Sequence, residues 1–78
     1  LEQTIGAIKN VKVIKTKNDE KMAFLLLSDG HVDLDIVVFP AVFKKFESIL
    51  ERDKRCIVTI KNNYQKDRWI LEKIKIID

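Results

Sequence analysis

Basic and aromatic side chains alternate in one short stretch near the end of this 78-residue sequence. Lysine and arginine bind phosphate groups and aromatic rings stack on nucleobases, so this mixture is typical of proteins that hold a single nucleic-acid strand. We expect Tyr64 to be exposed in a turn. Trp69 lies in a predicted strand, where packing in the core and contact with a ligand are both open. The candidates in this stretch are Lys61, Tyr64, Lys66, Arg68 and Trp69.

A second basic group surrounds the polar turn 16–20, whose residues form local side-chain hydrogen bonds readily. Lys15, Lys17 and Lys21 place three positive charges on this connection, and an ordinary solvated hairpin tip is the alternative interpretation. The formal net charge of +3 and the isoelectric point near 9.1 are compatible with a polyanionic partner, but many other domains share them.

The sequence shows no catalytic or metal-binding set. The one histidine, His31, lies in a predicted turn, and the one cysteine, Cys56, lies in a strand-like run where a buried thiol is expected. There is no glycine-rich phosphate loop, and no spacing typical of metal ligands. We therefore expect no cofactor and no catalysis by this domain itself.

Length and composition predict one domain over residues 1–78. A hydrophobic fraction of 46% and a charged fraction of 35% are ordinary for a globular protein. Because the chain begins at Leu1, we expect it to be cut from a longer protein. The sequence contains no apolar run long enough to span a bilayer, and a single unpaired cysteine fits a reducing cytoplasm.

The chain is organised around a predicted β-hairpin. Two apolar runs, 22–27 and 32–39, flank a Ser-Asp-Gly-His turn, and an Asp-Gly pair between such runs is a strong hairpin signal. In the second run, alternation predicts that Asp33 and Asp35 point outward, whereas Val32, Leu34, Ile36 and Val38 face the core. If Ala23 and Leu25 of the first run point outward as well, they form an apolar strip that could receive a base or a partner protein.

The remaining segments complete an all-β fold. Residues 4–15 predict a long first strand with a bend near Gly6 or Asn10, and the runs 54–61 and 68–77 predict two further strands. Pro40 opens a helical segment, whose apolar face is formed by Val42, Phe43, Phe46, Ile49 and Leu50. The order is three strands, a helix and two strands, as in a five-stranded OB-fold Greek-key barrel with its helix between strands 3 and 4.

The segment KMAFLLLSDG-HVDLDIVVFP resembles the OB-fold domain of the bacterial replicative DNA polymerase III alpha subunit, a C-family DNA polymerase. The shared pattern is a basic residue and Met-Ala-Phe, a hydrophobic segment closing on Asp, and a strand ending in Phe-Pro. Segment order extends the resemblance over nearly the whole chain. The matching residues are Lys21, Met22, Ala23, Phe24, Leu27, Asp29, Val37, Val38, Phe39 and Pro40.

The resemblance implies a cytoplasmic, monomeric module that binds single-stranded DNA and positions the unpaired template strand during DNA replication. Its other partners would be domains or subunits of the polymerase. The parent chain would be a DNA-directed DNA polymerase that transfers nucleotides with magnesium. Asp29, Asp33 and Asp35 could suggest a magnesium cluster, but the resemblance assigns them to the barrel and not to a polymerase palm. The expected binding residues are Lys15, Lys17, Lys21, Tyr64, Lys66, Arg68 and Trp69.

Two other functions stay open at this point. Outward carboxylates at Asp33 and Asp35 would repel phosphates, which favours a protein-interaction domain that uses the strip at Ala23 and Leu25. Anticodon-binding OB domains share a looser version of the same pattern, so RNA is the other alternative.

Overall fold

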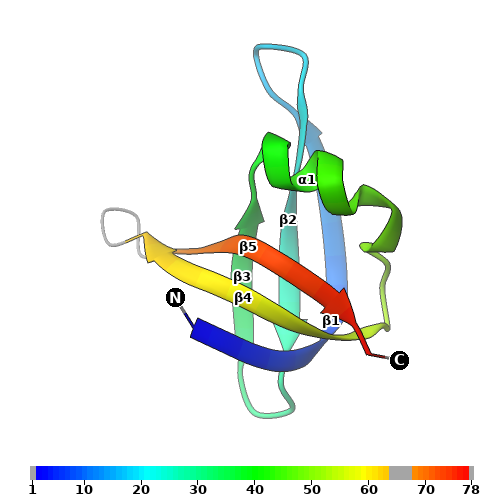
Figure 1. Ribbon diagram of the computed structural model, residues 1–78, viewed down its shortest axis with the longest axis vertical. Helices are drawn as coiled ribbons and strands as arrows, with labels where there is room; N and C mark the ends of the chain where they lie inside the picture. The colour runs from blue at the N-terminus through cyan, green and yellow to red at the C-terminus, as the bar shows by residue number, and fades with distance from the viewer. Residues whose placement is uncertain (1, 64–67, 78) are drawn as a thin grey trace.

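The computed structural model describes residues 2–63 and 68–77 (Figure 1). They form five strands and one short helix, in the order that the sequence predicts. The first three strands are β1 (Glu2–Lys15), β2 (Lys21–Ser28) and β3 (Asp33–Val38). They are followed by the helix α1 (Pro40–Phe46), a 3-10 turn η1 (Glu47–Ile49), and the strands β4 (Arg55–Asn63) and β5 (Arg68–Ile76).

The strands close into one barrel in the order β1-β2-β3-β5-β4. Neighbouring strands are antiparallel except β3 and β5, which run parallel with Ile36 opposite Trp69. Closure leaves no long free sheet edge for pairing with another chain. The predicted five-stranded barrel, with its helix between strands 3 and 4, is confirmed.

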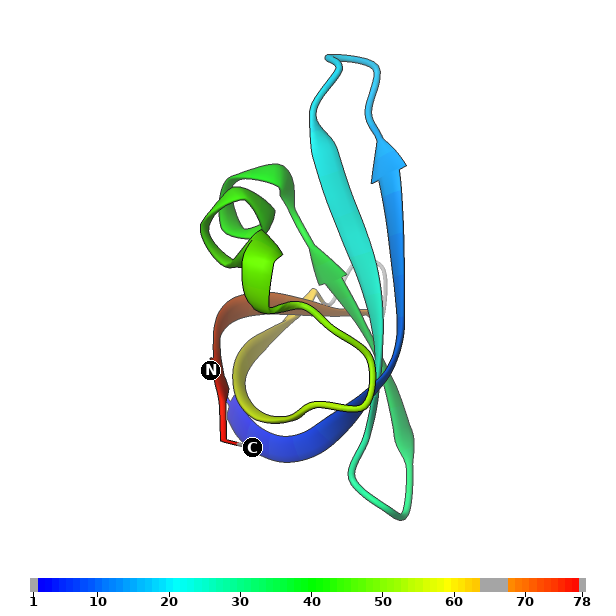
Figure 2. The same ribbon diagram turned by 90° about the vertical axis from the view of Figure 1, so that its right-hand side faces the viewer.

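Strand β1 is long enough to pair with two strands, with β4 along its first half and with β2 along its second half. The predicted bend is a β-bulge between Ile8 and Asn10, where the register against β2 shifts. At Gly6, a Cβ atom would lie only 2.6 Å from the carbonyl oxygen of Ser28, so a side chain there would collide with the end of β2. Figure 2 shows β1 curving out of the barrel into a long hairpin with β2.

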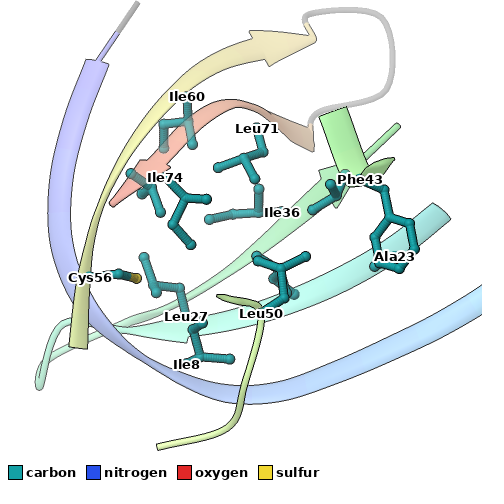
Figure 3. Packing of buried hydrophobic residues seen from close by; sticks show 13 residues of the cluster. Ile8, Ala23, Leu27, Ile36, Phe43, Leu50, Cys56, Ile60, Leu71 and Ile74 are labelled. Atoms are coloured by element: carbon teal, nitrogen blue, oxygen red, sulfur yellow. The ribbon is translucent and has the colours of Figure 1, made fainter. Parts of the chain in front are cut away.

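The hydrophobic core fills the inside of the barrel (Figure 3). Every strand contributes to it, and α1 adds Phe43, which is 3% exposed. The described domain therefore has a core of its own and does not depend on a neighbour to bury it. The core residues are Ile8, Ala23, Leu25, Leu27, Ile36, Val38, Phe43, Leu50, Cys56, Val58, Ile60, Leu71 and Ile74.

The prediction that Ala23 and Leu25 form an outward strip is wrong, since they are 0% and 1% exposed. Ala23 lies opposite Val38 and Leu25 lies opposite Ile36 in the β2–β3 pairing. Directly opposed residues point to the same side of a sheet, so the inward residues of β3 bring Ala23 and Leu25 inside. The strip that could have served a protein contact is part of the core.

The turn between β2 and β3 differs from the prediction at one residue. Val32 precedes β3 and is 55% exposed, so it does not face the core as expected. The Asp29 carboxylate accepts hydrogen bonds from the backbone N–H groups of His31 (2.8 Å) and Val32 (2.9 Å), which holds Val32 in the turn. Gly30 has a φ of 96°, a conformation that glycine adopts without strain.

Helix α1 covers one end of the barrel, as the sequence predicts (Figure 2). Pro40 occupies its first turn, where the missing N–H costs no hydrogen bond. Phe43 is buried, and Phe46 is partly buried against the core. Within residues 2–63 and 68–77, no helix has the length and apolar character needed to cross a bilayer.

Candidate nucleic-acid interface

The outward side of β2 carries a partly exposed aromatic ring. Since Ala23 and Leu25 point inward, alternation along β2 turns Met22, Phe24 and Leu26 to the outside, where each is partly buried. Phe24 is the one aromatic residue among them. The sequence analysis quoted Phe24 for the resemblance but did not include it among the binding residues.

Phe24 lies in a row that crosses the whole outer surface of this side of the barrel. Each residue of the row is the cross-strand partner of the next, so all of them point to the same face. The row has a lysine at each end and apolar side chains between them. We call it the outer row, and its members from β1 to β4 are Lys12, Phe24, Val37, Ile70 and Lys61.

Arg68 brings a further positive charge to the middle of the outer row. Its guanidinium carbon lies 5.9 Å from the centre of the Phe24 ring, within the range of a cation–π interaction. The Arg68 side chain is exposed, at the first residue of β5. A nucleobase could stack on the guanidinium plane or replace it on the ring, while the charge remains near the phosphates.

The two lysines at the ends of the row differ in their surroundings. Lys61 Nζ lies 2.9 Å from a carboxylate oxygen of Glu72, an exposed ion pair that partly neutralises it. For Lys12, no ion pair occurs with any other described residue. The Lys12 end is therefore the more positive end of the row.

The basic turn between β1 and β2 projects beyond the barrel, at the top of Figure 1. The hydroxyl of Thr16 accepts hydrogen bonds from the backbone of Asn18 and Glu20, both at 3.3 Å, and Lys15 pairs with Asp19 at 3.0 Å. Lys17 is exposed on this turn.

Lys21 points to the other side of the hairpin from Phe24. It lines a hollow of about 280 Å³ together with Phe43 of α1 and Glu47 of η1. Lys15 is its direct cross-strand partner and shares that side. The structure thus brings Lys15 and Lys21 together, but on the helix side and not on the outer row.

The predicted residues of the β4–β5 connection are only partly described. Arg68 lies over Phe24, and Trp69 is partly buried and packs against the core, opposite Ile36. Tyr64 and Lys66 lie outside the described residues.

The carboxylates of β3 do not form a magnesium site. Asp33 and Asp35 are exposed and outward, as predicted. In the part of the chain that the structure describes, no three His, Cys, Asp or Glu side chains gather closely enough to hold a metal ion. The magnesium implied for the parent polymerase therefore does not fit these residues.

Cys56 is fully buried, and burial raises the pKa of its thiol, so the thiol favours the neutral form.

Comparison with known proteins finds relatives of this barrel. DNA polymerase III subunit alpha of Staphylococcus aureus (strain N315) is 45% identical over 58 residues, which cover 74% of this chain and 5% of the relative. This chain is related to a segment of the DNA polymerase III alpha subunit. The same subunit of Staphylococcus epidermidis is 43% identical over 49 residues, which cover 63% of this chain and 5% of the relative.

The relation to DNA polymerase III subunit alpha confirms the resemblance that the Lys21–Pro40 segment suggested. No family model matches the chain. The chain spans only 5% of the length of these relatives, so their names describe far larger proteins than the barrel described above.

Proposed function

We propose that this chain is a non-catalytic OB module of a bacterial replicative DNA polymerase, and that it binds single-stranded DNA to position the unpaired template strand during replication. The relation to DNA polymerase III subunit alpha supports the setting, which is the bacterial cytoplasm. In this proposal, nucleotide transfer and its magnesium belong to other parts of the polymerase. The partners of the module are the DNA strand and neighbouring domains or subunits.

The outer row is the observation that carries this proposal. It joins an aromatic ring, a guanidinium group over that ring and two lysines on one face. Stacked bases need the ring and phosphates need the cations, and a single strand presents both at each nucleotide. The side chains of Val37 and Ile70 in the middle of the row are apolar, so they bring no negative charge that would repel phosphates.

A salt titration tests the proposal directly. We expect the chain to bind fluorescent single-stranded oligo(dT) at low salt and to lose affinity as salt rises, because bound cations release counterions from the strand. Lys12→Gln should make the log–log salt dependence shallower by about 0.7, the value for one phosphate contact on a single strand.

Lys75→Gln is the matched control for this titration. Lys75 lies opposite Ile57 in the β4–β5 pairing, four residues along β4 from Lys61 and so about 13 Å from the outer row, and its loss gives the same change in net charge. We expect it to leave the salt dependence unchanged. Absence of binding at low salt, or binding that ignores salt, would contradict the proposal. Tighter binding of oligo(U) than of oligo(dT) would favour the RNA alternative instead.

A second candidate function is contact with another protein domain, on a different surface from the one first predicted. Ile5 is 58% exposed and lies opposite Ile57 in the β1–β4 pairing. Together with Gln3 and Thr4, these residues line a shallow hollow of about 440 Å³. An uncovered aliphatic pair on a barrel surface favours a protein contact over a nucleic acid, since it offers neither charge nor an aromatic ring.

A further inference from the structure

Two exposed carboxylates lie on the same face as the outer row. Asp35 is two residues from Val37 on β3, so both side chains point outward and are separated by about 7 Å along the strand. Asp33 lies a further two residues along, opposite Ser28 at the end of β2. We call Asp33 and Asp35 the acidic border.

The negative charge of the acidic border is balanced only in part, by Arg68 on the neighbouring strand β5. Both side chains are exposed, and neither forms an ion pair with another described residue. On the β2 side, the cross-strand neighbours of Asp35 are Leu26 and, beyond it, Asn10, which are uncharged. On the β5 side, the parallel register that pairs Ile36 with Trp69 places Arg68 beside Asp35, but the Arg68 guanidinium lies over the Phe24 ring and forms no ion pair with Asp35. A phosphate on the outer row would lie within one screening length of Asp35, which is about 8 Å at physiological salt.

On the opposite side of the outer row, the adjacent outward pair carries no carboxylate. There the next outward pair is Ile14 and Met22, which are uncharged, and the hairpin continues to the exposed Lys17. A DNA strand that leaves the row toward Lys17 first meets these uncharged side chains. The turn beyond them carries Lys17 and also the carboxylates of Asp19, which is paired with Lys15, and Glu20. A strand that leaves the row toward the β2–β3 turn meets two carboxylates.

We propose that Asp33 and Asp35 determine the path and the length of the bound strand, by closing the face on the side of the β2–β3 turn. The inference rests on the proposed function and adds to it residues that exclude DNA instead of contacting it. The acidic border confines the strand to the outer row and to the part of the hairpin that extends toward Lys17.

The test compares the wild-type chain with Asp33→Asn/Asp35→Asn on oligo(dT) of increasing length, from about 3 to about 16 nucleotides. For the wild type, we expect the affinity to stop rising once the oligonucleotide fills the outer row and the hairpin. For the double variant, the affinity should go on rising to a longer length. On the longest oligonucleotide, the variant should bind about threefold to tenfold more tightly at low salt, and this gain should shrink as salt rises.

Glu47→Gln/Glu51→Gln is the matched control, because it raises the net charge by the same amount. Glu47 lies in η1 and Glu51 follows it, on the helix side of the barrel. This variant should keep the limiting length of the wild type, which is the oligonucleotide length at which the affinity stops rising. Thermal unfolding of all three chains checks that they are folded.

The outcomes separate this inference from the proposed function. If the wild type binds and the Asp33→Asn/Asp35→Asn variant shows the same limiting length, the inference is overturned and the proposed function stands. An equal gain in limiting length for the Glu47→Gln/Glu51→Gln control would also overturn it, since net charge would then explain the effect. Failure of the wild type to bind any oligonucleotide would remove both the inference and the proposed function.

Discussion

The ring of Phe24 is partly exposed on the outside of the barrel, and the guanidinium carbon of Arg68 lies 5.9 Å from its centre. Its cross-strand neighbour Val37 is 6% exposed and fixes the ring from one side. A ring held in this way loses little conformational freedom when a base stacks on it.

Replacing Phe24 by leucine should weaken binding of oligo(dT) by about 1–3 kcal/mol, because the stacking surface is lost while the position stays apolar. The measurement is the dissociation constant at low salt. Phe39→Leu is the control, since Phe39 is also partly exposed, at 44%, but lies after β3 and outside the outer row. Equal losses in the two variants would remove the special role of Phe24.

The Asp29 carboxylate makes the stability of the hairpin turn depend on pH. Hydrogen bonds from the backbone N–H groups of Val32 and His31 hold the pKa of Asp29 below its ordinary value of 3.8. A lowered pKa in the folded state means that the charged form stabilises the fold. This contribution is complete above 3.8 and is lost as the pH falls through the lower pKa of the folded state.

We therefore expect wild-type stability to exceed that of Asp29→Asn by a margin that is constant near neutral pH and shrinks in acid below 3.8. Urea unfolding of both chains over a pH series measures the margin. A margin that stays constant or grows in acid would show that the turn does not favour the charged carboxylate.

At the scale of the elements, the order of the strands and the position of the helix were predictable from the sequence. Turn residues separate the runs clearly, as at Asp29-Gly30, and Pro40 marks the start of the helix. The phase of β2 was not predictable from its own residues, because 22–27 is apolar at every position and shows no alternation. The pairing of Ala23 with Val38 and of Leu25 with Ile36 sets that phase. Because Ile36 and Val38 were expected to face the core, assuming this pairing would have predicted that Phe24 points outward.

Gly6 shows how tightly β1 approaches the end of β2. Gly6→Ala should lower the free energy of unfolding by about 1–3 kcal/mol, because its Cβ would lie 2.6 Å from the Ser28 carbonyl oxygen and 3.0 Å from the Leu27 side chain. Chemical denaturation measures the change. An unchanged or raised stability would mean that β1 and β2 separate at this point at no cost.

At the scale of the whole molecule, barrel closure brings residues from distant parts of the sequence onto one surface. Lys12 and Lys61 are 49 positions apart in the chain, yet they end the same row. The basic and aromatic residues, together with the OB-fold order, pointed to the two connecting loops. The contributions to binding of the predicted residues stay predictions; these are Lys15, Lys17, Lys21, Tyr64, Lys66, Arg68 and Trp69. The central face of the sheet was missed, because its members become neighbours only through the pairing of β3 with β5.

The most direct test of the account is backbone amide NMR of the chain during titration with single-stranded oligo(dT). The account predicts that the largest chemical-shift changes fall on the outer row and on Arg68. It also predicts small changes at the hollow lined by Gln3, Ile57 and Lys75, which lies farther along β4 and β5 from the outer row. The largest changes at that hollow, or no changes at low salt, would contradict it.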